Sequence, residues 1–201
     1  MDPAKIRLSA KETELVTNAD WILTKNGILQ KVNALLAAVQ PAQQDLLTAS
    51  SLPSEIIATS PKISKGENYK GLPYYVLDYP RLFTPEHVFA IRSFFWWGHF
   101  FSVTLQVSGR YKEQFQQQII EAHDELSNRD FFISLNESEW EHHFESDNYQ
   151  SIGRLTKEVF ANSIAGHRFI KIATQIPLSK WEEAGELLTS RFAFLLKILV
   201  A

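Results

Sequence analysis

The residues from Val88 to Gly109 constrain the fold more than any other part of the chain, because two β-rich runs flank a single glycine, Gly98. In the second run, apolar residues alternate with polar ones, which is the period-two pattern of a half-buried strand. β-branched and aromatic residues, which favour strands, dominate both runs. The stretch therefore predicts an antiparallel β-hairpin with its turn at Gly98.

The length of this turn decides which side chains share a face of the hairpin. A two-residue turn that includes Gly98 pairs odd positions of one strand with even positions of the other. Arg92 then lies on an otherwise apolar face with Phe101, Val103 and Leu105. The opposite face combines aromatic rings with hydroxyl and amide groups, from Phe89, Ile91, Ser93, Phe95, Trp97, Phe100, Ser102, Thr104, Gln106 and Ser108.

We expect the two-residue turn; a three-residue turn reverses the correspondence between the strands. An aromatic and polar face of this kind suits a ligand or a partner protein. Burial of the face beneath a layer of helices is the favoured alternative, because most aromatic side chains are simply buried.

The rest of the chain predicts further strands with helices between them. Helical spacing of apolar residues occurs in the first fifty residues, at 110–128, at 149–164 and from about 180 to the end. Strand patterns occur at 73–79, 131–135, 138–144 and 167–176, the second and third forming a hairpin. Because strands and helices do not alternate regularly, we expect an α+β fold with a largely antiparallel sheet of about five or six strands, packed with N-terminal, central and C-terminal helices.

Residues 1–50 are predicted to be a helical N-terminal arm, opened by a capping box at Ser9 and Glu12, that packs on an α+β domain at 51–201. The two parts together are expected to form one structural domain. Residues 50–72, with three lysines and two glycines, favour a surface loop, because the spacing of a phosphate-binding loop is missing. The final helix is apolar around nearly its whole circumference. It must be buried centrally or covered by another subunit.

Composition excludes several classes of protein. The chain contains no cysteine, which rules out disulfides, thiolate metal sites and cysteine nucleophiles. Its net charge of −3 gives no electrostatic footprint for nucleic acid. The first residues lack the apolar core of a signal peptide, and no apolar run reaches the ~20 residues that a membrane helix needs. We therefore expect a soluble, cytoplasmic protein that has neither a nucleic-acid nor a membrane partner.

A buried arginine requires a negatively charged partner, and Arg92 is the clearest case in the sequence. Asp78, on the neighbouring strand, is the candidate for a structural ion pair. The alternative is an anionic ligand held by Arg92, Arg81 and Arg110. The structural pair is favoured, because buried polar groups normally find partners within the protein.

Histidine is the other residue type in this chain that could act as a base or a metal ligand. His142 lies between two aromatic residues on one face of the predicted strand 138–144, where burial would lower its pKa and a carboxylate neighbour would raise it. The adjacent His143 would point to the opposite face together with Glu139, Glu141 and Glu145. The two histidines therefore cannot easily share a metal, and no metal site is predicted. The carboxylates between 137 and 147 are interpreted as the solvated edge of a hairpin.

No motif in the sequence fixes a reaction, so we leave open whether the protein is an enzyme, and we predict no cofactor. The leading hypothesis is a binding module that self-associates, as a homodimer, through its apolar terminal helices and the aromatic residues around Trp96 and Trp97. The alternative is a protein or enzyme that binds a small anionic ligand on the aromatic and polar face. Its candidate site residues are Asp78, Arg81, Arg92, Trp97, His99 and His142.

Overall fold

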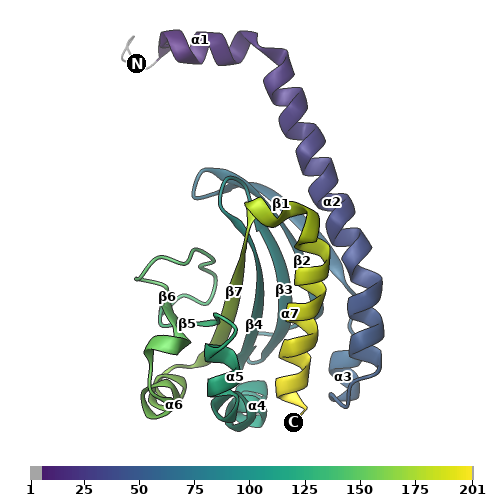
Figure 1. The fold of residues 1–201 in the computed structure, drawn as a ribbon, viewed down its shortest axis with the longest axis vertical. Helices are drawn as coiled ribbons and strands as arrows, with labels where there is room; N and C mark the ends of the chain where they lie inside the picture. Colours follow the sequence, from purple (N-terminus) through teal and green to yellow (C-terminus); the bar gives the residue numbers. More distant parts are fainter. Residues whose placement is uncertain (1–5, 201) are drawn as a thin grey trace.

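The structure is a computed structural model that describes residues 6–200, and it has an α+β fold (Figure 1). Its α-helices are α1 (Ala10–Thr17), α2 (Ala19–Thr48), α3 (Ser54–Ile57), α4 (Arg110–Glu121), α5 (His123–Ser127), α6 (Lys157–Gly166) and α7 (Ala184–Leu199). The strands are β1 (Lys62–Tyr69), β2 (Leu72–Phe83), β3 (Val88–Trp96), β4 (Phe100–Ser108), β5 (Phe132–Ser134), β6 (Tyr149–Ser151) and β7 (Phe169–Pro177). Short 3₁₀ turns, η2 (Ile152–Arg154) and η3 (Leu178–Glu183), precede α6 and α7.

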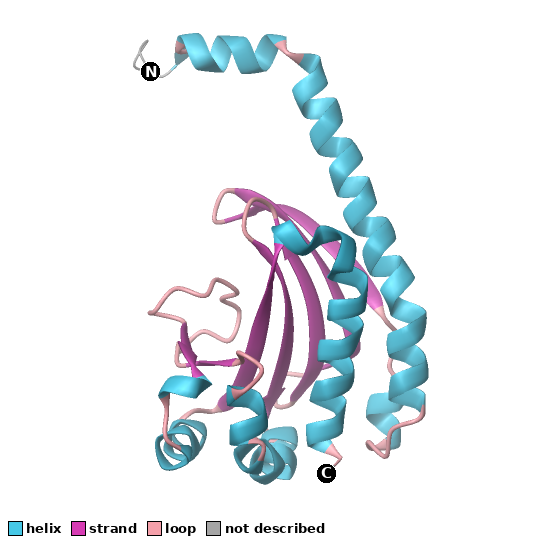
Figure 2. Cartoon of the chain, in the orientation of Figure 1, coloured by secondary structure: helices cyan, strands magenta, loops and turns pink. Residues whose placement is uncertain are grey.

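The strands form one sheet in the order β1-β2-β3-β4-β7-β5-β6, and every neighbouring pair is antiparallel. The α+β class with an antiparallel sheet is therefore confirmed. The sheet has seven strands rather than the expected five or six, because β1 lies within the stretch predicted as a loop at 50–72 and β6 occupies the predicted start of a helix at 149. Figure 2 shows α2 and α7 lying along one face of the sheet.

The core lies between the sheet and these helices. α7 buries residues around most of its circumference, namely Ala184, Leu188, Phe192, Phe194, Leu195, Leu196, Ile198 and Leu199. It packs against α2, α4 and the sheet. The apolar C-terminal helix was expected to be either buried centrally or covered by another subunit. In the structure it is buried centrally, by its own chain. The reason to place a subunit interface on this helix is thereby removed.

The predicted two-residue turn between β3 and β4 was wrong. Trp96 pairs with Phe100 and Arg92 pairs with Thr104, so the turn has three residues, centred on Gly98. Gly98 adopts a φ of +74°, a left-handed conformation that three-residue hairpins commonly need and that glycine tolerates. Arg92 consequently shares its face with hydroxyl and amide groups rather than with Val103 and Leu105.

The predicted strand at 138–144 was also wrong. β5 pairs with β6, and residues 135–148 between them form a long loop, which we call the strap. The buried side chain of Asn148 holds the two ends of this loop together: its carbonyl oxygen accepts from the Ser134 hydroxyl, and its amide donates to the carbonyl oxygen of His143. These side-chain bonds replace the strand ladder that the sequence pattern suggested.

The N-terminal helical segment packs on the domain along one part and extends away from it along another. The second half of α2 packs on the domain and buries residues from Leu29 to Leu47. α1 and the start of α2 extend away from the sheet (Figure 1). We call this projecting segment, residues 6–23, the arm. Its exposed apolar residues are Ile6, Leu8, Leu15, Val16, Trp21, Ile22 and Leu23. Within residues 6–200, no helix has the combination of length and apolar character that crossing a bilayer requires.

Candidate functional site

The sheet face opposite α2 and α7, which we call the outer face, carries a row of polar side chains across its middle. Arg92 on β3 is paired in register with Asp78 on β2 and with Thr104 on β4. Gln106 on β4 is paired in register with Lys171 on β7. Because residues in register point to the same side, the row runs over four strands. Beside it lies an aromatic cluster formed by Phe94, Trp96, Phe100, Tyr69, Tyr74 and Phe144 together with Val76.

Arg92 and Asp78 form a buried ion pair, as the sequence predicted. Arg92 Nε donates to Asp78 Oδ1 at 2.7 Å, and Nη2 donates to Oδ2 at 3.4 Å. The two side chains are only 10% and 13% exposed. Two parallel bonds of this kind fix the guanidinium group in orientation as well as in charge. Asp78 therefore supplies the negative charge that Arg92 needs. An anionic ligand was the alternative source of that charge.

His142 approaches this pair from the strap. Its Nε2 lies 3.2 Å from Arg92 Nη1, and because a guanidinium group can only donate, the imidazole must accept there. Burial, together with the positive charges of Arg92 and Lys171, places the pKa of His142 well below its usual range. Of the two opposing influences considered from the sequence, burial therefore sets the direction of the pKa shift, and the ring is neutral at physiological pH.

Lys171 is fully buried beneath the strap. Its ammonium group donates to the main-chain carbonyl oxygens of Glu139, at 2.9 Å, and of Glu141, and lies 5.7 Å from the centre of the Tyr149 ring. Burial and, secondarily, the charge of Arg92 lower the pKa of Lys171 to about 7. At neutral pH this lysine is thus poised between its charged and uncharged forms.

Side chains of the sheet hold the strap in place. The Tyr69 hydroxyl accepts from the main-chain N–H groups of His142, at 2.6 Å, and His143, at 3.0 Å, and it donates to Glu141 Oε2 at 3.1 Å. Burial raises the pKa of Tyr69 to about 12, so the hydroxyl keeps its proton. Gln106 Nε2 donates to Glu139 Oε2 at 3.0 Å. The strap, rather than a layer of helices, therefore covers the polar row.

We expect Tyr69→Phe to loosen the strap without unfolding the sheet. The change removes the acceptor for two main-chain N–H groups, and unsatisfied groups of this kind cost about 1–3 kcal/mol. Hydrogen exchange at His142 and His143 should become faster than in the wild type. Tyr74→Phe alters a neighbouring ring of the same cluster and is the control. Equal exchange in both variants would show that Tyr69 does not anchor the strap.

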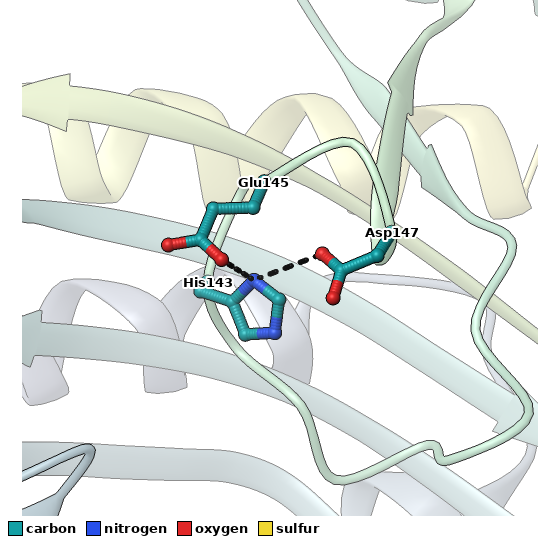
Figure 3. Close-up of side chains that lie close together, drawn as sticks. All are labelled: His143, Glu145 and Asp147. Atoms are coloured by element: carbon teal, nitrogen blue, oxygen red, sulfur yellow. Dashed lines mark ion pairs between the residues drawn. The ribbon is translucent and has the colours of Figure 1, made fainter.

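A second group of side chains meets at the end of the strap (Figure 3). His143 Nδ1 lies 3.6 Å from Glu145 Oε2 and 3.7 Å from Asp147 Oδ1, while its Nε2 lies 3.4 Å from Glu141 Oε2. The His143 side chain is 3% exposed, and its Nδ1 has no hydrogen-bond partner. The Glu145 and Asp147 side chains, by contrast, are 68% and 70% exposed. One buried imidazole nitrogen therefore faces two carboxylates that solvent can reach.

The six residues singled out in the sequence lie in three separate places. Asp78, Arg92 and His142 meet at the polar row. Trp97 and His99 lie at the β3–β4 turn, where the His99 ring stacks on Trp96 with centroids 3.6 Å apart and Trp97 packs against the core on the helix side of the sheet. Arg81 lies on β2 beyond a break in register, opposite Ala90.

Sequence reasoning missed Lys171 and Tyr69, which hold the strap. Lys171 had a usable signal: it stands between Ile170 and Ile172 in the middle of a strand, where a charged side chain on the far face needs a partner. Tyr69 had none, because it was assigned to a loop.

An open hollow of about 650 Å³ adjoins the strap, lined by Glu137, Ser138, Trp140, Gly166, His167, Arg168 and Phe169.

The chemistry available at the polar row is hydrogen bonding and charge compensation. Arg92 is matched by Asp78, and Lys171 is satisfied by main-chain carbonyls. The bond from Lys171 to the Glu139 carbonyl oxygen fastens the strap to the sheet. No match was found when the chain was compared with models of protein families, with curated proteins and with solved structures.

Proposed function

We propose that this protein is a non-catalytic binding module that self-associates through its N-terminal arm. The supporting observation is the run of exposed apolar side chains on the arm, where Val16 is 70%, Leu23 63% and Trp21 50% exposed. Exposed apolar side chains that gather on one projecting segment are typical of protein–protein contact sites, and tryptophan is a frequent anchor in them.

The bend between α1 and α2 gives the arm a defined shape. Asn18 ends α1 and caps α2, because its side-chain oxygen accepts from the N–H groups of Asp20 and Trp21. A hollow of about 580 Å³ lies inside the bend, lined by Leu8, Glu12, Leu15, Val16, Asn18, Ala19, Trp21 and Ile22. An amphipathic helix that lies in an apolar groove is a common mode of recognition.

The charges of the arm favour a second copy of the same arm as the occupant. Arg7 and Lys11 precede Glu14 and Asp20 along the chain. Antiparallel pairing of two arms about Thr13 brings each basic residue near an acidic residue of the other copy. The arm carries two basic residues against three acidic ones, counting Glu12, so its net charge of −1 gives no attraction to an anionic membrane.

Leu15→Glu and Trp21→Glu are expected to weaken dimerisation at least ~100-fold. Each apolar side chain contributes about 1.5–3 kcal/mol when buried, and each contact occurs twice in a two-fold interface. Sedimentation velocity over a concentration series measures the change, and circular dichroism checks the helix content. Val159→Glu, at an apolar position of α6 that is 47% exposed, is the control and should dimerise as the wild type does. A wild-type protein that remains monomeric at all concentrations would rule the proposal out.

A charge exchange separates a second copy from every other occupant. Lys11→Glu should weaken the dimer about 2- to 30-fold, since an exposed ion pair contributes about 0.2–1 kcal/mol and is lost twice. Adding Glu14→Lys to the same chain restores opposite charges across an antiparallel pair and should restore the dimer. If the double variant is weaker than the single one, the antiparallel arrangement is wrong.

The binding of a small anionic ligand on the outer face stays a prediction with less support. Its main argument was an arginine in need of a negative partner, and Asp78 is such a partner. The expected cytoplasmic location likewise stays a prediction.

A further inference from the structure

We propose that His143, Glu145 and Asp147 bind a divalent transition-metal ion of the Zn²⁺ class. One potential ligand atom from each of these three residues lies within 4.8 Å of the other two (Figure 3). Imidazole nitrogen and carboxylate oxygen are both ordinary ligands of Zn²⁺. The proposal is independent of the arm, since all three residues belong to the strap.

The buried nitrogen atom of His143 is the observation that points to an ion rather than to a solvated acidic loop. His143 Nδ1 is buried without a hydrogen-bond partner and faces both carboxylates. Buried polar atoms without a partner are rare and need an explanation. The gaps of 3.6 and 3.7 Å are too long for hydrogen bonds. Two ligands of one tetrahedral Zn²⁺, each 2.0–2.1 Å from the metal, lie about 3.4 Å apart, so an ion fits between them with little movement.

Glu141 adds the outer contact that metal-binding histidines usually have. Its Oε2 lies 3.4 Å from His143 Nε2, on the side of the ring away from the two carboxylates. A proton on Nε2 pointing at Glu141 leaves the lone pair on Nδ1, directed at the ion position. A carboxylate in this place fixes the orientation of the ring and strengthens the imidazole as a ligand.

The main chain is already folded for this arrangement. The N–H groups of Asn148 and Tyr149 both donate to the carbonyl oxygen of Glu145 at 2.9 Å, and the Asn148 side chain donates to the carbonyl oxygen of His143. These bonds close a tight turn that brings Glu145 and Asp147 to the same imidazole. The exposed carboxylates leave a route for the ion and room for a water ligand. One nitrogen ligand favours a transition metal over Ca²⁺, which takes oxygen ligands.

Titration of the full-length, tag-free protein with Zn²⁺ after treatment with a chelator tests the proposal. Calorimetry should show one ion per chain, and Zn²⁺ at 100 times its Kd should raise the melting temperature by about 5–10 °C. Glu145→Gln and Asp147→Asn should each weaken binding at least ~10-fold, because each removes a charged ligand without changing the shape of the side chain. Both side chains are exposed, so these variants are expected to fold as the wild type does.

Two control variants separate the site from chance binding at the surface. Glu137→Gln changes an exposed carboxylate of the same strap, and His99→Gln changes an exposed histidine far from it along the chain. Both should bind Zn²⁺ with wild-type affinity. If the wild type does not bind Zn²⁺ at roughly millimolar concentration, its affinity is far weaker than that of protein zinc sites, and the proposal is overturned. If Glu145→Gln and Asp147→Asn bind Zn²⁺ with the same affinity as the wild type, the proposal is overturned as well.

Discussion

Arg92→Met is expected to lower the free energy of unfolding by about 3–5 kcal/mol, as the loss of one partner from a buried ion pair typically does. The reason is Asp78. Its carboxylate lies 2.7 Å from Arg92 Nε, with a side chain only 13% exposed, and in the variant it keeps its burial but loses its cation. The Nε2 atom of His142 loses its donor at the same time. Urea unfolding monitored by tryptophan fluorescence measures the effect.

Replacing both members of the pair separates the cost of an orphaned charge from the worth of the pair itself. The double variant Asp78→Val with Arg92→Met should recover most of the lost stability, because buried pairs are often no better than apolar residues of similar volume. Lys197→Met breaks the exposed bridge to Glu125, in which the side chains are 64% and 50% exposed, and should cost less than ~1 kcal/mol. A loss below ~1 kcal/mol for Arg92→Met would contradict the view that the pair is electrostatically buried.

The Asp78–Arg92 pair could be predicted from the sequence because its cause is local. An arginine in the middle of an apolar strand needs a carboxylate, and the neighbouring strand offered one. The face on which the pair lies was predicted wrongly, because Arg92 is paired with Thr104 and does not share a face with Val103 and Leu105. Trp97, Gly98 and His99 are compatible with two turn lengths, and the choice rests on the pairing of whole strands and on the positive φ of Gly98.

The strap shows why a strand pattern can mislead. Residues 138–144 alternate between aromatic and polar types, yet this segment forms no ladder. Its main-chain groups bond instead to side chains of the sheet: the N–H groups of His142 and His143 to the Tyr69 hydroxyl, and the carbonyl oxygens of Glu139 and Glu141 to Lys171. Partners far away in the sequence leave no local trace, so sequence periodicity alone could not reveal them.

The grouping proposed as a metal site was partly visible in the sequence. His143, Glu145 and Asp147 are spaced two residues apart, and the predicted strand placed His143 and Glu145 on one face. The carboxylates were nevertheless interpreted as a solvated edge. Sequence reasoning lacked the observation that supports the proposal, which is that His143 is buried while Glu145 and Asp147 are exposed.

The stability of the folded protein is expected to rise by about 3 kcal/mol between pH 7 and about 9.5, because Lys171 titrates differently in the folded and unfolded states. In the folded protein burial lowers the pKa of this lysine to about 7, whereas its ordinary value is 10.5. Between these values the unfolded chain binds a proton that the folded chain has released. Stability must then increase with pH, since raising the pH removes the advantage of the unfolded chain.

The groups that face Lys171 set the limits of this pH range. The charge of Arg92 lowers the pKa of the lysine further, while the carboxylates of Glu139 and Glu141 oppose the shift. The neutral ring of His142 carries no charge in this range. Above about pH 10 the raised pKa values of Tyr69 and Tyr149 act in the opposite direction, because only the unfolded chain then releases those tyrosine protons. The measurement therefore belongs below pH 10.

Lys171→Met should remove this pH dependence, and the difference between variant and wild type isolates the lysine from every other titrating group. Urea unfolding at several pH values from 7 to about 9.5 gives, for the wild type and for the variant, the slope of the free energy of unfolding against pH. Lys157→Met, at an exposed position of α6, is the matched control and should keep the wild-type slope. Because Lys171 contacts the strap only through main-chain carbonyls, a slope unchanged in Lys171→Met would mean that water reaches the ammonium group and that the strap is open in solution. A slope that disappears would mean that the strap stays closed over a buried lysine.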